Sequence, residues 1–109
     1  AVNSCCVFAV SADGKRVETI EGIGSEEHPH PLQQAFIDAG AIQCGFCTPG
    51  MIMAAKALLD HNPHPTREEI RQAMSGNLCR CTGYEKIEQA IEMAAEVVAH
   101  YAAGEEEQA

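Results

Sequence analysis

Apolar residues recur every three or four positions along most of the chain from residue 31 onward. This spacing is typical of amphipathic α-helices, which turn one apolar stripe toward a core. In the longest example, Ile87, Ala90 and Ile91 alternate with glutamates that fall on the opposite face. We predict four helices, over residues 31–39, 49–61, 67–75 and 84–103.

The ends of the predicted helices carry capping residues and helix breakers. Thr48 is expected to cap the second helix, with Pro49 next, because proline suits a first-turn position that needs no N–H donor. Thr66 and Glu69 have the spacing of a capping box before the third helix. Four such helices with short connections form a small bundle. Its expected core residues are Leu32, Ala35, Phe36, Ala39, Ile52, Ala55, Leu58, Leu59, Ile87, Ala90, Ile91, Ala94, Val98 and Tyr101.

The first 24 residues have a different pattern. Two short strand-like runs, 6–10 and 16–20, flank Asp13-Gly14, and an Asp-Gly pair between such runs is typical of a tight β-hairpin. A lone hairpin is at best marginally stable, so the rest of a sheet or a partner must cover it. We therefore divide the chain into a hairpin segment at 1–24, a helical domain at 25–103 and an acidic tail at 104–109.

Composition and charge exclude several classes of function. The 109 residues carry a formal net charge of −9, whereas a nucleic-acid-binding surface needs a basic face. No apolar stretch approaches the roughly 18 residues expected of a membrane span. We therefore expect no nucleic-acid partner and no membrane span. The chain also shows no acid–base pair or activated nucleophile, so no catalytic residue is assigned.

Four of the six cysteines form two close pairs, Cys44 with Cys47 and Cys79 with Cys81. Each pair lies between two predicted helices, so two helix–loop–helix units would bring the four thiols to one end of the bundle. Such tight pairs do not fit a loop-stapling disulfide framework. An all-sulfur set of four selects an iron–sulfur cluster, Zn²⁺ or Cu(I), and the spacing leaves the metal open. The C-x-C spacing of the second pair is less usual for zinc.

Both cysteine loops carry extended motifs. Gln43-Cys-Gly-Phe-Cys-Thr-Pro-Gly50 and Gly76-Asn-Leu-Cys-Arg-Cys-Thr-Gly-Tyr84, with their separation, resemble the helical [2Fe-2S] domain of the xanthine oxidase family of molybdenum hydroxylases. The resemblance covers about residues 30–98. It implies a mostly α fold: a four-helix bundle carrying a [2Fe-2S] cluster, preceded by the β-hairpin remnant of a plant-type ferredoxin-like domain. It also implies iron as the metal, with the ligands Cys44, Cys47, Cys79 and Cys81.

The N-terminal segment is similar to the end of the family's ferredoxin-like domain. Asn3-Ser4-Cys5 matches a motif whose cysteine is the fourth ligand of a second [2Fe-2S] cluster, so the resemblance makes Cys5 an orphan ligand. The family's three other ligands would lie before Ala1. We therefore expect this chain to be a fragment without its ferredoxin-like half. Cys6 is expected to be a small buried apolar side chain.

The family resemblance implies electron transfer within an oxidoreductase. Members oxidise their substrates at a molybdopterin-bound molybdenum on a large subunit, and electrons then pass through both clusters, usually to FAD on another subunit. The cluster in this chain would be the one nearest the molybdenum, with Gln43 hydrogen-bonded to the pterin and Cys81 lying against it. The implied partners are the molybdopterin-binding subunit, the FAD-binding subunit, and the ferredoxin-like half. The expected location is the cytoplasm, unless an export signal preceded the chain.

A second hypothesis requires no redox chemistry. The four cysteines would hold zinc, and the helical bundle would serve only as an assembly module. The two hypotheses differ in colour, because an iron–sulfur protein is reddish brown and a zinc protein is colourless.

Overall fold

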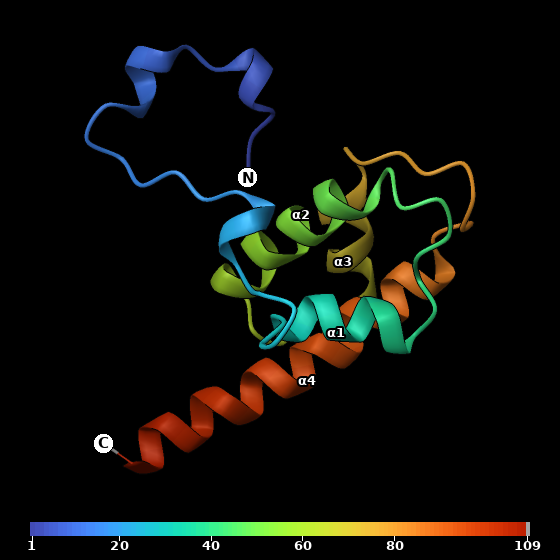
Figure 1. The fold of residues 1–109 in the computed structure, drawn as a ribbon. Coiled ribbons are helices and arrows are strands. Elements are labelled where there is room, and N and C mark those ends of the chain that lie inside the picture. Colours follow the sequence, from blue (N-terminus) through green and yellow to red (C-terminus); the bar gives the residue numbers. More distant parts are fainter. Residues whose placement is uncertain (109) are drawn as a thin grey trace.

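The structure, a computed structural model, describes the backbone of residues 1–108 and the side chains of residues 1–100. It is mostly helical, which confirms the predicted fold class at that level (Figure 1). The α-helices are α1 (Pro31–Asp38), α2 (Thr48–His61), α3 (Arg67–Met74) and α4 (Glu85–Gln108). Short 3-10 helices precede them in the chain: η1 (Ser4–Cys6), η2 (Ala9–Ala12) and η3 (Ile20–Gly22).

The helix boundaries agree with the predicted ones to within about two residues, except at the end of α4. α4 continues to Gln108, into the predicted acidic tail, so the backbone there is helical. The core position predicted at Tyr101 lies outside the described side chains, and Ala109 lies outside the described residues altogether.

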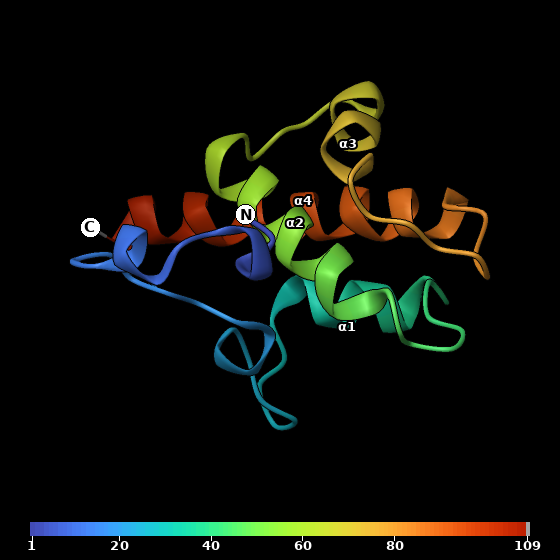
Figure 2. The same ribbon diagram turned by 90° about the horizontal axis from the view of Figure 1, so that it is seen from above.

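The four helices pack around one apolar core. α1 lies along the first half of α4, α2 packs against α3, and α2 also contacts α1 and α4 (Figures 1 and 2). Burying a large apolar side chain contributes about 1.5–3 kcal/mol relative to leaving it exposed. The largest fully buried side chains are Leu32, Phe36, Met51, Ile70, Ile87 and Ile91, and they come from all four helices. This shared core holds the loops between the helices in fixed positions.

Side chains cap the starts of α1 and α3. At α3, the hydroxyl of Thr66 accepts a hydrogen bond from the Glu69 N–H at 3.2 Å, and the Glu69 carboxylate accepts one from the Thr66 N–H at 3.1 Å, which confirms the predicted capping box. At α1, Nδ1 of His30 accepts a hydrogen bond from the Leu32 N–H at 3.1 Å. The Gln33 side chain accepts one from the His30 N–H at 2.9 Å. The sequence did not predict this cap, because histidine is not a common N-cap residue.

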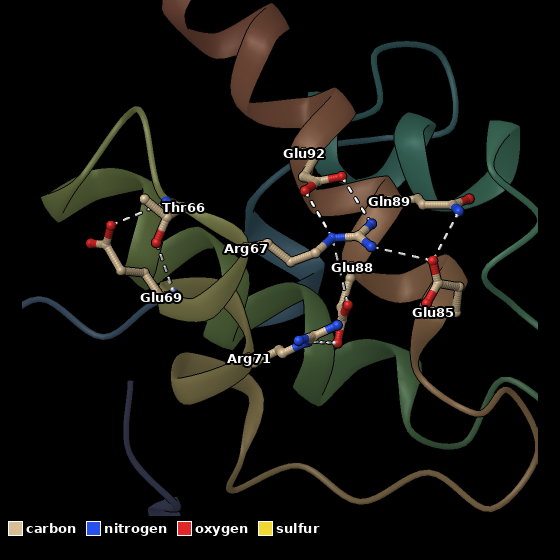
Figure 3. Close-up of polar contacts among 8 residues, drawn as sticks. All are labelled: Thr66, Arg67, Glu69, Arg71, Glu85, Glu88, Gln89 and Glu92. Carbon is tan, nitrogen blue, oxygen red and sulfur yellow. Dashed lines mark hydrogen bonds and ion pairs between the residues drawn. The ribbon is translucent and has the colours of Figure 1, made fainter.

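Ion pairs join α3 to α4 beside the core (Figure 3). Arg67 makes a two-pronged contact with Glu92, at 3.0 Å from Nε and 3.1 Å from Nη2. Arg71 Nε donates to the buried Glu88 carboxylate at 3.1 Å. Charge-assisted hydrogen bonds of this kind are stronger than neutral ones. They hold the two helices that flank the second cysteine loop.

The structure does not confirm the β-hairpin predicted for the N-terminal segment. In the described residues this segment contains η1, η2 and η3 and no strand, and Val2, Phe8, Val10 and Val17 are exposed. A hairpin without neighbouring strands lacks the packing that stabilises it. The expectation that Cys6 is buried is wrong for the same reason, because no sheet covers its exposed thiol.

Over residues 1–108, none of the helices combines the length and the apolar character that crossing a membrane requires.

Candidate metal centre

The two cysteine loops lie next to each other at one end of the helical domain. One loop connects α1 to α2 and the other connects α3 to α4, and both views place them side by side (Figures 1 and 2). The first loop leaves α1 at Gly40, whose φ of +67° lets the Ala41 N–H bond back to the Phe36 carbonyl at 2.9 Å. Ala41 is buried, so the start of this loop is anchored in the core.

The first cysteine pair is bridged by Gly45, which adopts a φ of +85° between Cys44 and Cys47. Only glycine takes this left-handed conformation without strain. α2 begins at Thr48, with Cys47 rather than Thr48 in the cap position. The Thr48 side chain is then free to hydrogen-bond to Cys47, which acts to lower the pKa of that thiol.

Cys47 and Cys79 form the inner pair of thiols. Both are half-buried, and each thiol contributes to the pKa shift of the other across the two loops. Burial raises the pKa of Cys47, and its hydrogen bond with Cys79 raises it further. The pKa of Cys79 is instead lowered to about 7, mainly by the Thr82 side chain and then by backbone hydrogen bonds from Thr82 and Cys81.

Cys44 and Cys81 form the outer pair, and both are exposed. A hydrogen bond with the Cys44 side chain is the main cause that raises the pKa of Cys81. Charge interactions also link Cys44 to Cys47 and Cys79 to Cys81, so the four thiols influence one another as one group. The sequence prediction that the two loops converge is therefore supported by this coupling.

The strongest influences of one thiol on another run across the two loops, from Cys79 to Cys47 and from Cys44 to Cys81. Among the described residues, no group of three or more ligand side chains is close enough to hold a single metal ion. A mononuclear zinc site draws four sulfurs to about 2.3 Å from one centre. A [2Fe-2S] cluster instead takes two sulfurs on each of its two irons. Four thiols, two from each loop, can supply two sulfurs to each iron of such a centre.

The other residues predicted for the site lie in two different places. Gln43 is exposed and adjoins Cys44 in the first loop. Cys5 is in η1, apart from the two cysteine loops (Figure 1), with its sulfur 3.8 Å from that of Cys6. The structure thus places Gln43 beside the four thiols and does not bring Cys5 to them.

Two side-chain hydroxyl groups of the second loop, those of Thr82 and Tyr84, were not predicted from the sequence, although the Thr82 backbone N–H was expected to hydrogen-bond to sulfur. The Thr82 hydroxyl donates a hydrogen bond to the Cys79 sulfur at 3.1 Å, and the Tyr84 hydroxyl accepts one from the Cys79 N–H at 2.9 Å. The only indication of these contacts in the sequence was that Thr82 and Tyr84 belong to the Cys-Thr-Gly-Tyr motif. Their contacts depend on a backbone conformation that spacing alone does not reveal.

A small helical domain with four cysteines on two adjoining loops defines a metalloprotein of the all-cysteine class, with iron–sulfur and zinc as the candidate centres. Comparison with known families agrees with this class, because residues 19–92 match the model of the "[2Fe-2S] binding domain". The chain belongs to the [2Fe-2S] binding domain family. This membership identifies iron as the metal and favours it over zinc.

Relatives with known names agree with the family resemblance found in the sequence. The chain is 59% identical to the nicotinate dehydrogenase small FeS subunit of Eubacterium barkeri, over 87% of this chain and 60% of the relative. It is 50% identical to the nicotine 6-hydroxylase small subunit of Paenarthrobacter nicotinovorans, over 84% of this chain and 54% of the relative. The chain therefore spans somewhat more than half the length of these curated relatives.

A solved structure shows the same fold. Quinoline 2-oxidoreductase from Pseudomonas putida 86 superposes with a TM-score of 0.82 at 48% identity, over 91% of this chain and 62% of that one. These similarities confirm the resemblance to the iron–sulfur subunits of molybdenum hydroxylases.

Proposed function

We propose that this chain is the electron-transfer iron–sulfur component of a molybdenum hydroxylase. It would pass electrons from a molybdopterin centre on a large subunit toward a second [2Fe-2S] cluster and FAD. The observation that carries the proposal is the coupling of four thiols, two from each of two adjoining loops, in a member of the [2Fe-2S] binding domain family. The names of the relatives support the same interpretation, since they include small subunits of dehydrogenases and hydroxylases.

The ligand set follows from the thiol pairs. We propose that Cys44 and Cys81 bind one iron and that Cys47 and Cys79 bind the other, because Cys44 shifts the pKa of Cys81 and Cys79 shifts that of Cys47. When bound, such a cluster accepts and releases one electron at a time. The four helices would hold the two loops at a fixed separation. We interpret these helices as the four-helix bundle of the family.

The exposure of the thiols suggests which side of the site meets the molybdopterin subunit. Cys44 and Cys81 are exposed, whereas Cys47 and Cys79 are half-buried. Exposed Gln43 adjoins the outer pair and has both a donor and an acceptor for a pterin. We propose that the outer pair and Gln43 face the molybdopterin subunit, with Cys81 on the electron path.

The N-terminal segment has a separate role in this proposal. Residues 1–24 would be the end of a ferredoxin-like domain and would form the predicted β-hairpin where the rest of that sheet is present. The exposed apolar side chains of Val2, Phe8 and Val10 would then pack against it. Cys5 would supply one of the four ligands of the second cluster.

The proposed function is tested by the visible spectrum of anaerobically purified chain. We expect a reddish-brown protein whose absorption bleaches when dithionite supplies one electron per cluster, with a paramagnetic signal appearing at the same time. A colourless chain that contains zinc would support the assembly module instead.

A further inference from the structure

Three hydrogen bonds form a closed ring in the second cysteine loop. The Cys79 N–H donates to the Tyr84 hydroxyl at 2.9 Å, and the Tyr84 N–H donates to the Thr82 hydroxyl at 3.2 Å. The Thr82 hydroxyl in turn donates to the Cys79 sulfur at 3.1 Å. Each member is half-buried, and Cys79 and Tyr84 also pack against the core. The ring therefore connects a ligand thiol to the core through Thr82.

The backbone is bent to allow this ring. Tyr84 has a φ of +73°, and it is the one non-glycine residue with a positive φ among the described residues. A bulky side chain in this left-handed region costs free energy, so the surrounding contacts must hold it there. The Tyr84 hydroxyl is held by its hydrogen bond from the Cys79 N–H. The backbone carbonyl of Tyr84 accepts a hydrogen bond from the Glu88 N–H at 3.0 Å, in the first turn of α4. α4 thus holds the ring in position.

The ring also gives Cys79 a different environment from that of Cys81, the other proposed ligand in the same loop. The Cys79 sulfur accepts a hydrogen bond from the Thr82 hydroxyl, and the backbone N–H groups of Thr82 and Cys81 also lower the pKa of this thiol. The Cys81 sulfur is exposed, and its main partner is another thiol, that of Cys44. Hydrogen bonds to ligand sulfurs are one of the means by which a protein sets the potential of an iron–sulfur cluster.

We propose that Thr82 is a positioning residue whose hydroxyl fixes the Cys79 sulfur and raises the reduction potential of the cluster. This inference rests on the proposed function, because it requires the [2Fe-2S] cluster to be bound at the four thiols. Reduction adds one electron, and hence one negative charge, to the cluster and its ligand sulfurs. A donor aimed at one of those sulfurs stabilises the reduced state more than the oxidised state. The Tyr84 N–H, by occupying a lone pair of the hydroxyl, leaves its hydrogen directed at Cys79.

The test is a redox titration of the full chain loaded with its cluster, with mediators and dithionite, followed by the paramagnetic signal of the reduced state. Thr82→Val keeps the shape of the side chain and removes the hydroxyl. We expect it to lower the potential by an amount on the order of a tenfold change in the reduction equilibrium, or about 59 mV for one electron. Thr82→Ser retains the hydroxyl and should restore the wild-type potential. Thr19→Val, the same change in the exposed N-terminal segment, is the matched control and should have no effect.

Each outcome separates this inference from the proposed function. If wild-type chain binds no [2Fe-2S] cluster, the proposed function fails and this inference fails with it. If Thr82→Val binds the cluster at an unchanged potential, or if Thr82→Ser is shifted as much as Thr82→Val, only this inference is overturned. If Thr82→Val no longer retains the cluster while Thr82→Ser retains it at the wild-type potential, the hydroxyl is required to position Cys79, as proposed.

Discussion

At the scale of single residues, the four thiols proposed as ligands differ in exposure and in hydrogen bonding. Cys47 and Cys79 are half-buried and Cys44 and Cys81 are exposed, although all four lie in short loops of similar composition. The sequence predicted the four thiols, because two tight cysteine pairs at such spacing are typical of metal ligands. It did not predict Thr82 and Tyr84, whose contacts with Cys79 require the left-handed backbone at Tyr84.

Replacement of an inner ligand is the direct test at this scale. We expect Cys79→Ser to abolish the cluster, because one iron would lose half of its proposed protein ligands. The variant should also unfold at lower temperature, since metal binding contributes to folding free energy when the site joins separate loops. Iron analysis and thermal unfolding measure the two effects. Cys6→Ser is the control, and an unchanged iron content in Cys79→Ser would refute the ligand assignment.

At the scale of elements, helix ends were predicted where their capping chemistry is common. The capping box at Thr66 was found from the sequence because threonine and glutamate have the expected spacing. The cap at His30 was not found, since it depends on which ring nitrogen faces the Leu32 N–H. The hairpin was predicted from an Asp-Gly pair and short apolar runs, but local preference does not replace the neighbouring strands that stabilise a sheet.

The His30 cap makes the stability of α1 depend on pH. The pKa of His30 is lowered, chiefly because burial disfavours the charged ring and also because Lys56 is near, while Asp60 and Glu18 act in the opposite direction. A neutral Nδ1 is needed to accept the Leu32 N–H. The stabilisation from this cap is therefore present above the ordinary histidine pKa of 6.5 and is lost as the pH falls through the lowered value in the folded state.

Two substitutions at His30 distinguish the stabilisation that the cap provides from the pH dependence that the His30 ring causes. His30→Ala should cost about 1 kcal/mol at neutral pH, as is typical for loss of an N-cap. His30→Asn should keep the cap, because its amide oxygen accepts the same N–H, and should remove this part of the pH dependence. Urea unfolding near pH 7.5 and near pH 5 measures both effects. If wild type and His30→Asn lose stability equally on acidification, His30 is not the responsible group.

At the scale of the whole molecule, the four thiols of the proposed metal centre and the buried core both lie in the helical part of the chain. The buried core is drawn from residues 32–95, and η3 is the element of the first 24 residues that contacts α2. The sequence predicted a division between these two parts from their different hydrophobic periods. The arrangement of residues 1–24 was not predictable, because it depends on surfaces that the helical domain does not supply.

Limited proteolysis tests whether the helical part holds the metal centre without most of the N-terminal segment. Lys15 and Arg16 are exposed in the N-terminal segment, so trypsin should cut there early. The large fragment should keep its visible absorption and its ratio of iron to protein, because the four ligand cysteines and the core remain in it. Mass spectrometry identifies the cut, and the spectrum of the same sample reports on the cluster. Loss of the cluster in step with this cut would show that the N-terminal segment is needed to hold it.

The central claim is that the four thiols hold one two-iron cluster. The most direct measurement is the content of iron, acid-labile sulfide and zinc in chain purified without oxygen. The account predicts about two irons and two sulfides per chain, and no zinc beyond trace. About one zinc per chain with no sulfide would contradict it and would leave an assembly module whose cysteines have a structural role.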